Sequence, residues 1–315
     1  MSPSIGIARG ETDRDQPKEI LRQADLAMYE AKSRGKAQHE VYDPVMDARA
    51  TERMNLERDL RRAVEREELE IHYQPKVLLA TGAIGGVESL LRWQHPERGL
   101  LEANQFIELT EKTGLISQIG LWVLKESCRQ LKEWQELYPA RLGLPFGMCV
   151  NLSAEQIRQS DLADNVTSVL HETGLDPACL MLEITERTAQ EDAEQTIDKL
   201  RELKSLGVKL ALDDFGTGYC SLVYLEHSLL DFLKIDRLLV HRKREDNPEG
   251  YSKVISAMTR MAHSLDLTVI VEGVETEEQL AKLKEIGCDM AQGYYFAKPL
   301  PSEAIESLLR EDAFS

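Results

Sequence analysis

The chain has 315 residues, enough for one large or two ordinary domains with a substantial buried core. Its 55 acidic residues outnumber its 38 basic residues, and the formal net charge is -17. This excess argues against a broad nucleic-acid surface or an anionic membrane partner, because both need clustered positive charge. We therefore expect neither a nucleic-acid polymer nor a membrane among the partners of this segment.

The cysteine pattern and the hydropathy of the sequence indicate the cellular compartment of the chain. Five cysteines are scattered along the sequence, with neither zinc-binding spacing nor a disulfide framework, which is typical of a reducing cytosol. The N-terminus carries no signal-peptide pattern, and no apolar stretch approaches about 18 residues. We predict a cytoplasmic segment, and a membrane anchor upstream in a longer natural chain stays open.

The N-terminal residues are organised differently from the rest. A short strand is predicted over residues 4–8, and apolar residues at helical spacing follow between positions 20 and 31. One strand and one helix cannot bury a core, so residues 1–46 are predicted to be a fragment of a larger domain. A charged helix over residues 47–67 is predicted as a connector, and the main domain then spans residues 68–315.

Strand and helix signals alternate through the main domain. We predict strands over residues 69–77, 84–93, 148–152, 179–185, 208–213, 232–236, 267–273 and 290–297. We predict helices over residues 103–113, 116–137, 154–172, 189–206, 253–265, 277–286 and 302–310. This α/β alternation is typical of a (β/α)8 TIM-like barrel, and a doubly wound open sheet is the alternative. Both folds bind ligands at the C-terminal ends of their strands.

Two adjacent carboxylates, Asp213 and Asp214, close the apolar run at residues 208–212. Buried charges need a cation, a salt bridge or a metal, although a single Asp here would fit a helix cap. Successive strand residues point to opposite faces, so both acids can face one site only if the backbone leaves the pleat there. Gly216 and Gly218 make that departure feasible.

Most other predicted strands also carry polar side chains near their C-terminal ends. These residues are Glu88, Arg92, Asn151, Glu183, Glu186, Lys234, Asp236, Glu272, Glu275 and Gln292. Helix capping explains one or two acids but not acids converging from several strands, because crowded like charges repel. Carboxylates and an amide, without His or Cys, suit Mg²⁺ or Mn²⁺, with Ca²⁺ as a competitor. The number of acids predicts two ions, which typically clamp a phosphoryl group and activate the attacking water.

Lys234 adds a positive charge beside these acids. Its ammonium group can orient or deprotonate a water molecule, or neutralise a phosphate oxygen. The alternative is a buried salt bridge with Asp236, two positions along on the same strand face.

Eight short motifs follow one another in the main domain. They are Tyr-Gln-Pro-Lys at 73–76, Glu-Ser-Leu-Leu-Arg-Trp at 88–93, Asn-Leu-Ser at 151–153, Leu-Glu-Ile-Thr-Glu at 182–186, Asp-Asp-Phe-Gly-Thr-Gly-Tyr at 213–219, Leu-Lys-Ile-Asp-Arg at 233–237, Glu-Gly-Val-Glu-Thr at 272–276 and Gln-Gly-Tyr-Tyr-Phe at 292–296. In this order, residues 55–312 resemble the EAL domain, the cyclic di-GMP phosphodiesterase family. The resemblance implies a barrel with an antiparallel first strand. It also implies hydrolysis of cyclic di-GMP to linear pGpG with Mg²⁺ or Mn²⁺, and inhibition by Ca²⁺.

The resemblance also implies roles for individual residues. The implied metal ligands, with Asp213 bridging two ions, are Glu88, Asn151, Glu183, Asp213 and Asp214. Lys234 and Glu272 are expected to position or activate the water, and Glu186 to hold the loop from Asp214 to Tyr219. The residues expected to contact the substrate or support its site are Gln74, Arg92, Asp236, Glu275 and Gln292.

Four positions depart from what is usual in the family. Cys220 stands where the family usually has Ser, and Leu229 replaces a common Pro before the sixth strand. The other two departures are Ser89 and Arg187. The signature Glu-Ala-Leu is Glu88-Ser89-Leu90 here, and strand alternation points Ser89 away from the site. Arg187 follows Glu186 where the family usually has Ser, and can disturb the loop support. No metal ligand is lost, so we predict an active phosphodiesterase, with an EAL-type receptor that binds cyclic di-GMP without cutting it as the alternative. A homodimer through the loop and helix after Asp214 is compatible with either.

Residues 4–43 resemble the C-terminal piece of a GGDEF, or diguanylate cyclase, domain. The resemblance is clearest in Ala-Asp-Leu-Ala-Met-Tyr-Glu-Ala-Lys at residues 24–32. The motif that gives that domain its activity is absent, so this piece is not expected to make cyclic di-GMP. We interpret it as a cut from a tandem protein, with a docking element as the alternative.

Overall fold

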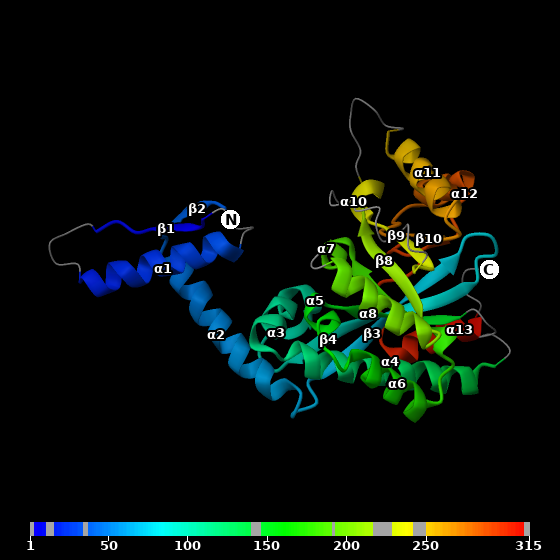
Figure 1. The fold of residues 1–315 in the computed structure, drawn as a ribbon, viewed down its shortest axis with the longest axis horizontal. Helices are drawn as coiled ribbons and strands as arrows, with labels where there is room; N and C mark the ends of the chain where they lie inside the picture. Colours follow the sequence, from blue (N-terminus) through cyan, green and yellow to red (C-terminus); the bar gives the residue numbers. More distant parts are fainter. Residues whose placement is uncertain are drawn as a thin grey trace. The chain divides into compact units, whose positions relative to one another are not determined.

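The computed structural model of the chain describes residues 3–10, 16–33, 37–139, 146–190, 193–216, 229–241 and 250–311. The chain divides into two compact units, residues 1–66 and 67–315, which are described separately (Figure 1). The loop predicted to follow Asp214 falls outside the described residues from position 217 to 228. Its support by Glu186 and its part in a dimer therefore stay predictions.

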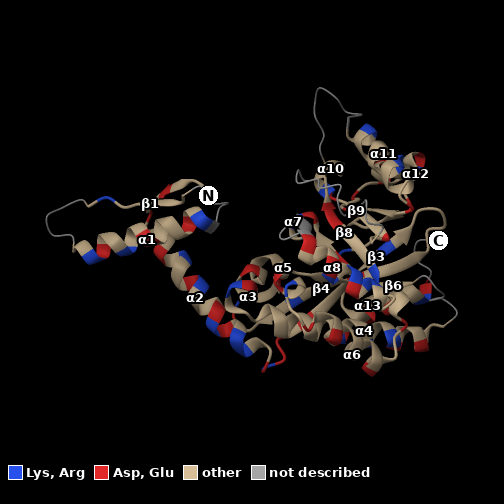
Figure 2. Ribbon diagram, in the orientation of Figure 1, with Lys and Arg blue, Asp and Glu red and all other residues tan. Residues whose placement is uncertain are grey.

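The first unit is a β–α–β arrangement followed by a long helix. Its elements are β1 (Ile5–Ile7), α1 (Pro17–Ser33), β2 (His39–Val41) and α2 (Val45–Ala63). Strands β1 and β2 pair in parallel, with Ile5 opposite His39. The sequence did not predict β2, a three-residue strand that pairs with β1. Basic and acidic residues are intermixed along α2, the helix predicted as a connector (Figure 2).

The second unit is a closed eight-stranded barrel. Its strands are β3 (Leu69–Leu78), β4 (Ile84–His95), β6 (Gly147–Leu152), β7 (Leu180–Thr185), β8 (Lys209–Phe215), β9 (Phe232–Ile235), β10 (Thr268–Val271) and β11 (Met290–Ala291). The order around the barrel is β3-β11-β10-β9-β8-β7-β6-β4, and β4 pairs back with β3. Strand β3 is antiparallel to both of its neighbours, whereas the other neighbouring strands in the ring are parallel. The predicted barrel with an antiparallel first strand is confirmed, and the open-sheet alternative is wrong. A further short strand, β5 (Gly99–Glu102), extends β4 as a hairpin.

Helices follow most of the barrel strands along the chain, whereas β3 and β4 follow each other directly (Figure 1). They are η1 (Ala103–Gln105), α3 (Ile107–Thr113), α4 (Ile116–Leu137), α5 (Ala154–Ile157), α6 (Leu162–Thr173), η2 (Pro177–Cys179), α7 (Glu186–Gln190), α8 (Ala193–Ser205), α10 (Arg237–Val240), α11 (Gly250–His263), α12 (Glu277–Ile286) and α13 (Ser302–Glu311). In the described parts of the chain, no helix has the length and hydropathy that crossing a membrane requires.

Several predicted elements differ from the observed ones, and two of these differences have identifiable reasons. The helix predicted over residues 154–172 is two helices, because the Ser153 cap starts the short helix α5 and a turn at residues 158–161 separates it from α6. The last strand ends at Ala291 rather than at residue 297. Beyond it, Tyr295 donates its backbone N–H to the carbonyl of Val274 at 2.9 Å, so the chain bonds to a neighbouring loop instead of continuing the ladder.

The barrel interior is built in layers, and this layering positions the polar residues. An apolar layer inside the barrel consists of Cys149, Met181, Ala211, Ile270 and Met290. Side chains alternate along a strand, so the next inward-facing residue lies two positions further towards the C-terminal end. Those positions hold Asn151, Glu183, Asp213, Glu272 and Gln292. The apolar layer therefore forms the floor of a polar layer at the C-terminal mouth of the barrel.

Candidate active site

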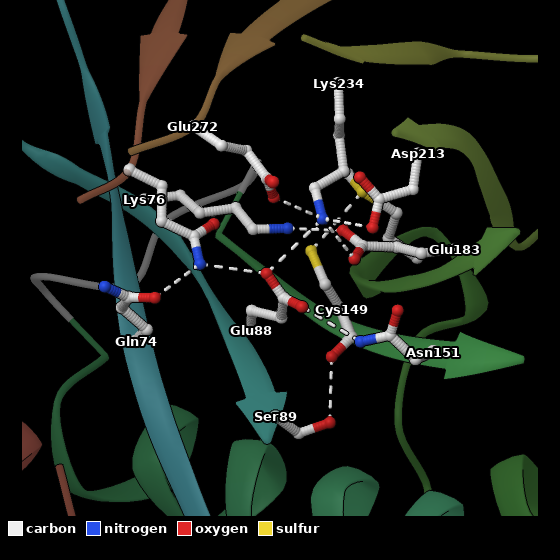
Figure 3. A network of polar contacts seen from close by, with 12 residues as sticks. Gln74, Lys76, Glu88, Ser89, Cys149, Asn151, Glu183, Asp213, Lys234 and Glu272 are labelled. Carbon is white, nitrogen blue, oxygen red and sulfur yellow. Dashed lines mark hydrogen bonds and ion pairs between the residues drawn. The ribbon is translucent and has the colours of Figure 1, made fainter. Parts of the chain in front are cut away.

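Lys234, on β9, lies at the centre of the polar layer and has no solvent exposure. Its Nζ lies 2.7 Å from Glu183 Oε2, 2.7 Å from Glu272 Oε1, 2.9 Å from Asp213 Oδ2 and 3.4 Å from Glu88 Oε2 (Figure 3). These four acids come from different strands or from the residue that follows a strand. Asp236 is not among the partners found for Lys234 in the described chain, and instead it caps α10 by accepting from the N–H of Leu238 at 2.7 Å.

A second buried lysine, Lys76, reaches the same layer from β3. Its Nζ lies 2.5 Å from Oε1 of Glu183, so Glu183 is held between two ammonium groups, with Oε2 on Lys234 (Figure 3). Sequence reasoning placed Lys76 in a motif but gave it no role. The signal was its place two positions after Gln74, which puts both side chains on the inner face of the strand.

Side-chain amides hold Glu88 in a fixed position. Asn151 donates to Glu88 Oε1 at 2.9 Å, and Gln292 donates to Glu88 Oε2 at 2.9 Å. The same Gln292 amide also lies 2.8 Å from Oε1 of Gln74, whose own amide donates to the carbonyl of Ala297 at 2.9 Å. The structure thus brings Gln74 and Gln292 together at Glu88, while Asn151 stays exposed at the mouth of the barrel.

The backbone leaves the pleat at Asp214, as the sequence predicted. Asp214 has a φ of +58°, and the pairing of β8 with β9 is irregular between Leu212 and Phe215. The carboxyl groups of Asp214 and Asp236 lie close to each other. Burial and the Asp236 carboxylate both raise the pKa of Asp214 above its ordinary value. Asp214 and Asp236 therefore form an acidic pair beside the four acids around Lys234.

Burial and the buried lysines shift the pKa values of three of these acids in different directions. Burial raises the pKa of Glu88, but the ammonium groups of Lys234 and Lys76 outweigh it and hold the pKa at about 2. Burial also raises the pKa of Asp213 and of Glu272, and the attraction of Lys234 offsets this only in part. When ionised, the four carboxylates exceed the two ammonium groups by two negative charges.

This donor set fits a divalent cation. The oxygens come from carboxylates and one amide, which is the chemistry that Mg²⁺ and Mn²⁺ prefer, and one such ion would balance the two excess charges. As the acids stand, no group of three His, Cys, Asp or Glu side chains in the described ranges is arranged to hold a metal ion. The acidic side chains around Lys234 turn towards its ammonium group instead.

Three other predicted site residues lie outside this network. Arg92 is buried on the same face of β4 as Glu88, and it donates to the carbonyl of Leu91 at 2.9 Å. Glu275 is exposed, with its carboxylate 3.6 Å from Nε2 of His241. Glu186 is buried, and neither of its carboxylate oxygens has a hydrogen-bond partner of standard geometry within the described residues.

The surroundings of Ser89 and Glu186 concern two of the four departures from the family, at Ser89 and at Arg187, which follows Glu186. Burial raises the pKa of Glu186, and the backbone amide of Gly216 partly opposes this, so Glu186 lies beside the start of the loop it was predicted to hold. Ser89 donates to the carbonyl of Cys149 at 2.9 Å and points out of the barrel interior, as strand alternation predicted (Figure 3). The hydroxyl thus bonds to backbone on the far side of β4 from the acidic layer.

Comparison with known proteins places these features in a family. The EAL domain model matches residues 57–299. The chain is 42% identical over 305 residues to the bifunctional diguanylate cyclase/cyclic di-GMP phosphodiesterase MucR of Pseudomonas aeruginosa, covering 97% of this chain and 44% of the relative. It is 39% identical over 316 residues to the cyclic di-GMP phosphodiesterase NbdA of the same organism, covering 100% of this chain and 39% of the relative. The chain spans less than half the length of these curated relatives.

Solved structures are similar too. The MucR phosphodiesterase in complex with c-di-GMP superposes with a TM-score of 0.74 at 43% identity, covering 80% of this chain and 99% of that one. The EAL enzyme Bd1971, in a form bound to cAMP and cyclic di-GMP, superposes with a TM-score of 0.78 at 32% identity, covering 94% of this chain and 77% of that one. On its sequence and its barrel, the chain belongs to the EAL domain family.

Proposed function

We propose that the barrel hydrolyses one phosphodiester bond of cyclic di-GMP to give linear pGpG. The observation that carries the proposal is the convergence of Glu88, Glu183, Asp213 and Glu272 on the buried ammonium group of Lys234. Cyclic di-GMP is proposed as the substrate because two relatives are named cyclic di-GMP phosphodiesterases and a similar chain is solved in complex with c-di-GMP.

Two divalent ions, Mg²⁺ or Mn²⁺, complete the proposed site. When bound, such ions polarise the phosphoryl oxygens and lower the pKa of the attacking water. Glu88, Asn151, Glu183 and Asp213 would hold the first ion, and Asp213 with Asp214 the second. Ca²⁺ is proposed to inhibit, because its preference for more numerous and longer oxygen contacts does not suit a compact site.

The residues of the chain have distinct tasks in this proposal. Nζ of Lys234 and Oε1 of Glu272, 2.7 Å apart, orient the attacking water. The Glu272 carboxylate takes the proton of the water as the new oxygen–phosphorus bond forms and the bond from phosphorus to the ribose 3′ oxygen breaks, and that leaving oxygen is then protonated. Gln74 and Gln292 fix the carboxylate of Glu88 through the hydrogen bonds described above. Arg92, on the same face of β4, is proposed to neutralise a phosphate oxygen of the bound substrate, as guanidinium groups commonly do.

A hydrolysis assay tests the proposal directly. The purified chain, freed of metal by chelation and reloaded, should convert cyclic di-GMP to pGpG with Mg²⁺ or Mn²⁺ and not with Ca²⁺. Replacing Glu88 by Ala should abolish turnover, because it removes a central carboxylate of the site. Binding of cyclic di-GMP without turnover in Mn²⁺ would instead favour the receptor function. Retained activity in Glu88→Ala would count against the assigned metal site.

We also propose that residues 1–46 are the C-terminal part of a GGDEF domain. Two observations support this: the β–α–β arrangement of this unit, and matches to longer relatives that extend beyond residues 57–299 to 97% of the chain or more. The homodimer through the loop and helix after Asp214 remains a proposal, which light scattering at high protein concentration would test.

A further inference from the structure

Lys76 occupies an unusual place inside the barrel. It is buried to 1% exposure between the apolar floor and the acidic layer, and the thiol of Cys149 lies close to it (Figure 3). Burial of an ammonium group is costly, and the 2.5 Å ion pair to Oε1 of Glu183 offsets this cost. A lysine that only filled space would be replaced at lower cost by Met or Leu.

The backbone around Lys76 is shaped to deliver this contact. The register of β3 against β4 shifts between Lys76 and Val77, which marks a β-bulge, a device that re-aims side chains. Opposite Lys76 stands Gly86, where an added Cβ would come within 2.6 Å of the carbonyl oxygen of Gly147. Because Gly86 has no side chain, the space opposite it inside the barrel is available to the side chain of Lys76.

In this arrangement, each carboxylate oxygen of Glu183 contacts a different lysine. Its Oε1 is bound to Lys76, and its Oε2 faces Lys234 and the other acids. Only Oε2 is directed into the acidic layer, so only this oxygen is available to a metal ion bound there. Free rotation that would offer both oxygens at once to a single ion is blocked while Lys76 holds Oε1.

We propose that Lys76 is a positioning residue that makes Glu183 a one-oxygen donor and so selects between divalent cations. The inference rests on the metal site of the proposed function. Mg²⁺ and Mn²⁺ suit sites built from single carboxylate oxygens in compact octahedral geometry, whereas Ca²⁺ takes about six to eight oxygens and often both oxygens of one carboxylate. Releasing Oε1 should favour Ca²⁺.

The ratio of the Ca²⁺ and Mn²⁺ dissociation constants distinguishes a change in the number of Glu183 oxygens from a change in the net charge of the site. Removing Lys76 makes the site one unit more negative, which strengthens the binding of any divalent cation by a similar factor. That common factor cancels in the ratio of the Ca²⁺ and Mn²⁺ dissociation constants. A change in the ratio of the two dissociation constants therefore reports how many oxygens Glu183 offers to the ion, and it does not report the net charge of the site.

The experiment titrates Ca²⁺ and Mn²⁺ calorimetrically into the metal-free full chain. Variants are Lys76→Met, Lys76→Arg and, as a matched control, Lys204→Met, which removes an ion pair to Asp231 before β9, away from the mouth. We expect the Ca²⁺-to-Mn²⁺ ratio of dissociation constants to fall about tenfold in Lys76→Met, which is about 1.4 kcal/mol. Lys76→Arg and Lys204→Met should keep the wild-type ratio.

Several outcomes would overturn the inference. Equal changes in both affinities for Lys76→Met would show that Lys76 acts through charge alone, and unchanged affinities would show that it only fills space. If circular dichroism shows that Lys76→Met does not fold, Lys76→Gln supplies the neutral variant for the same titration. A wild-type chain that binds neither cation would count against the proposed metal site itself. An unchanged ratio in a chain that hydrolyses cyclic di-GMP would count against Lys76 alone.

Discussion

The backbone N–H of Asp214 donates to Oδ1 of Asp213 at 2.8 Å, while Asp214 itself adopts a φ of +58°. Left-handed backbone is uncommon outside glycine and is tolerated best by Asn and Asp. This turn lets two consecutive acids stay at the same mouth of the barrel, with Asp213 against Lys234 and Asp214 beside Asp236. A regular strand would have sent them to opposite faces.

Two substitutions at Asp214 should separate its backbone role from its carboxylate. Asp214→Asn keeps a residue that tolerates positive φ, so we expect a normal melting temperature and turnover reduced about 10–100-fold. Asp214→Val places a β-branched residue in left-handed backbone and should cost about 1–2 kcal/mol of stability. Thermal unfolding and the hydrolysis assay measure the two effects, and wild-type stability in Asp214→Val would contradict the backbone argument.

Ser89→Ala should have a small effect on stability and almost none on activity. The change removes the 2.9 Å hydrogen bond to the carbonyl of Cys149, which is worth about 1 kcal/mol. Turnover should stay within about twofold, because Ser89 points away from the acidic layer. Denaturant unfolding with the hydrolysis assay checks both. A large loss of turnover would mean that the hydroxyl supports the site through β6.

Lys234→Met should destabilise the metal-free protein. Among the described residues, the change leaves Lys76 as the one buried ammonium group beside the four carboxylates. Breaking a buried ion pair typically costs about 3–5 kcal/mol. Mn²⁺ should then raise the melting temperature of Lys234→Met more than that of the wild type, because the cation replaces the lost charge. Lys204→Met is the surface control, and equal melting temperatures in chelator for the wild type and Lys234→Met would contradict the prediction.

Gly293→Ala should lower the stability of the protein and displace Gln292, although Gly293 itself is not a site residue. A Cβ at Gly293 would lie 2.1 Å from the carbonyl oxygen of Val274, so the loop has to move, and Gln292 moves with it away from Glu88. Overpacking of this kind costs about 1–3 kcal/mol. Gly147→Ala is the control, since its nearest contact would be an ordinary 3.4 Å from the carbonyl of Cys179. Equal melting temperatures for the two variants would rule out the proposed clash.

Much of the barrel could be predicted from the sequence, because strand and helix signals are local. Helix α4 was predicted over its full length, and the strand periodicity that places Glu183 and Asp213 on the inner face is carried by neighbouring residues. Elements without a local signal were missed. The three residues of β2 are held by pairing with β1, and β11 stops early because Tyr295 bonds to Val274, which is distant in sequence.

The sequence by itself determined which residue types stand at the strand ends, and hence the acidic, metal-compatible chemistry of the site. It also determined the irregular strand end, because two adjacent acids cannot share a face of a regular strand. Only the tertiary structure decided the partners. It paired Lys234 with four acids rather than with Asp236, and it brought Lys76 to Glu183 across the barrel. Such contacts depend on barrel closure, which joins residues that are far apart in the chain and that no local pattern relates.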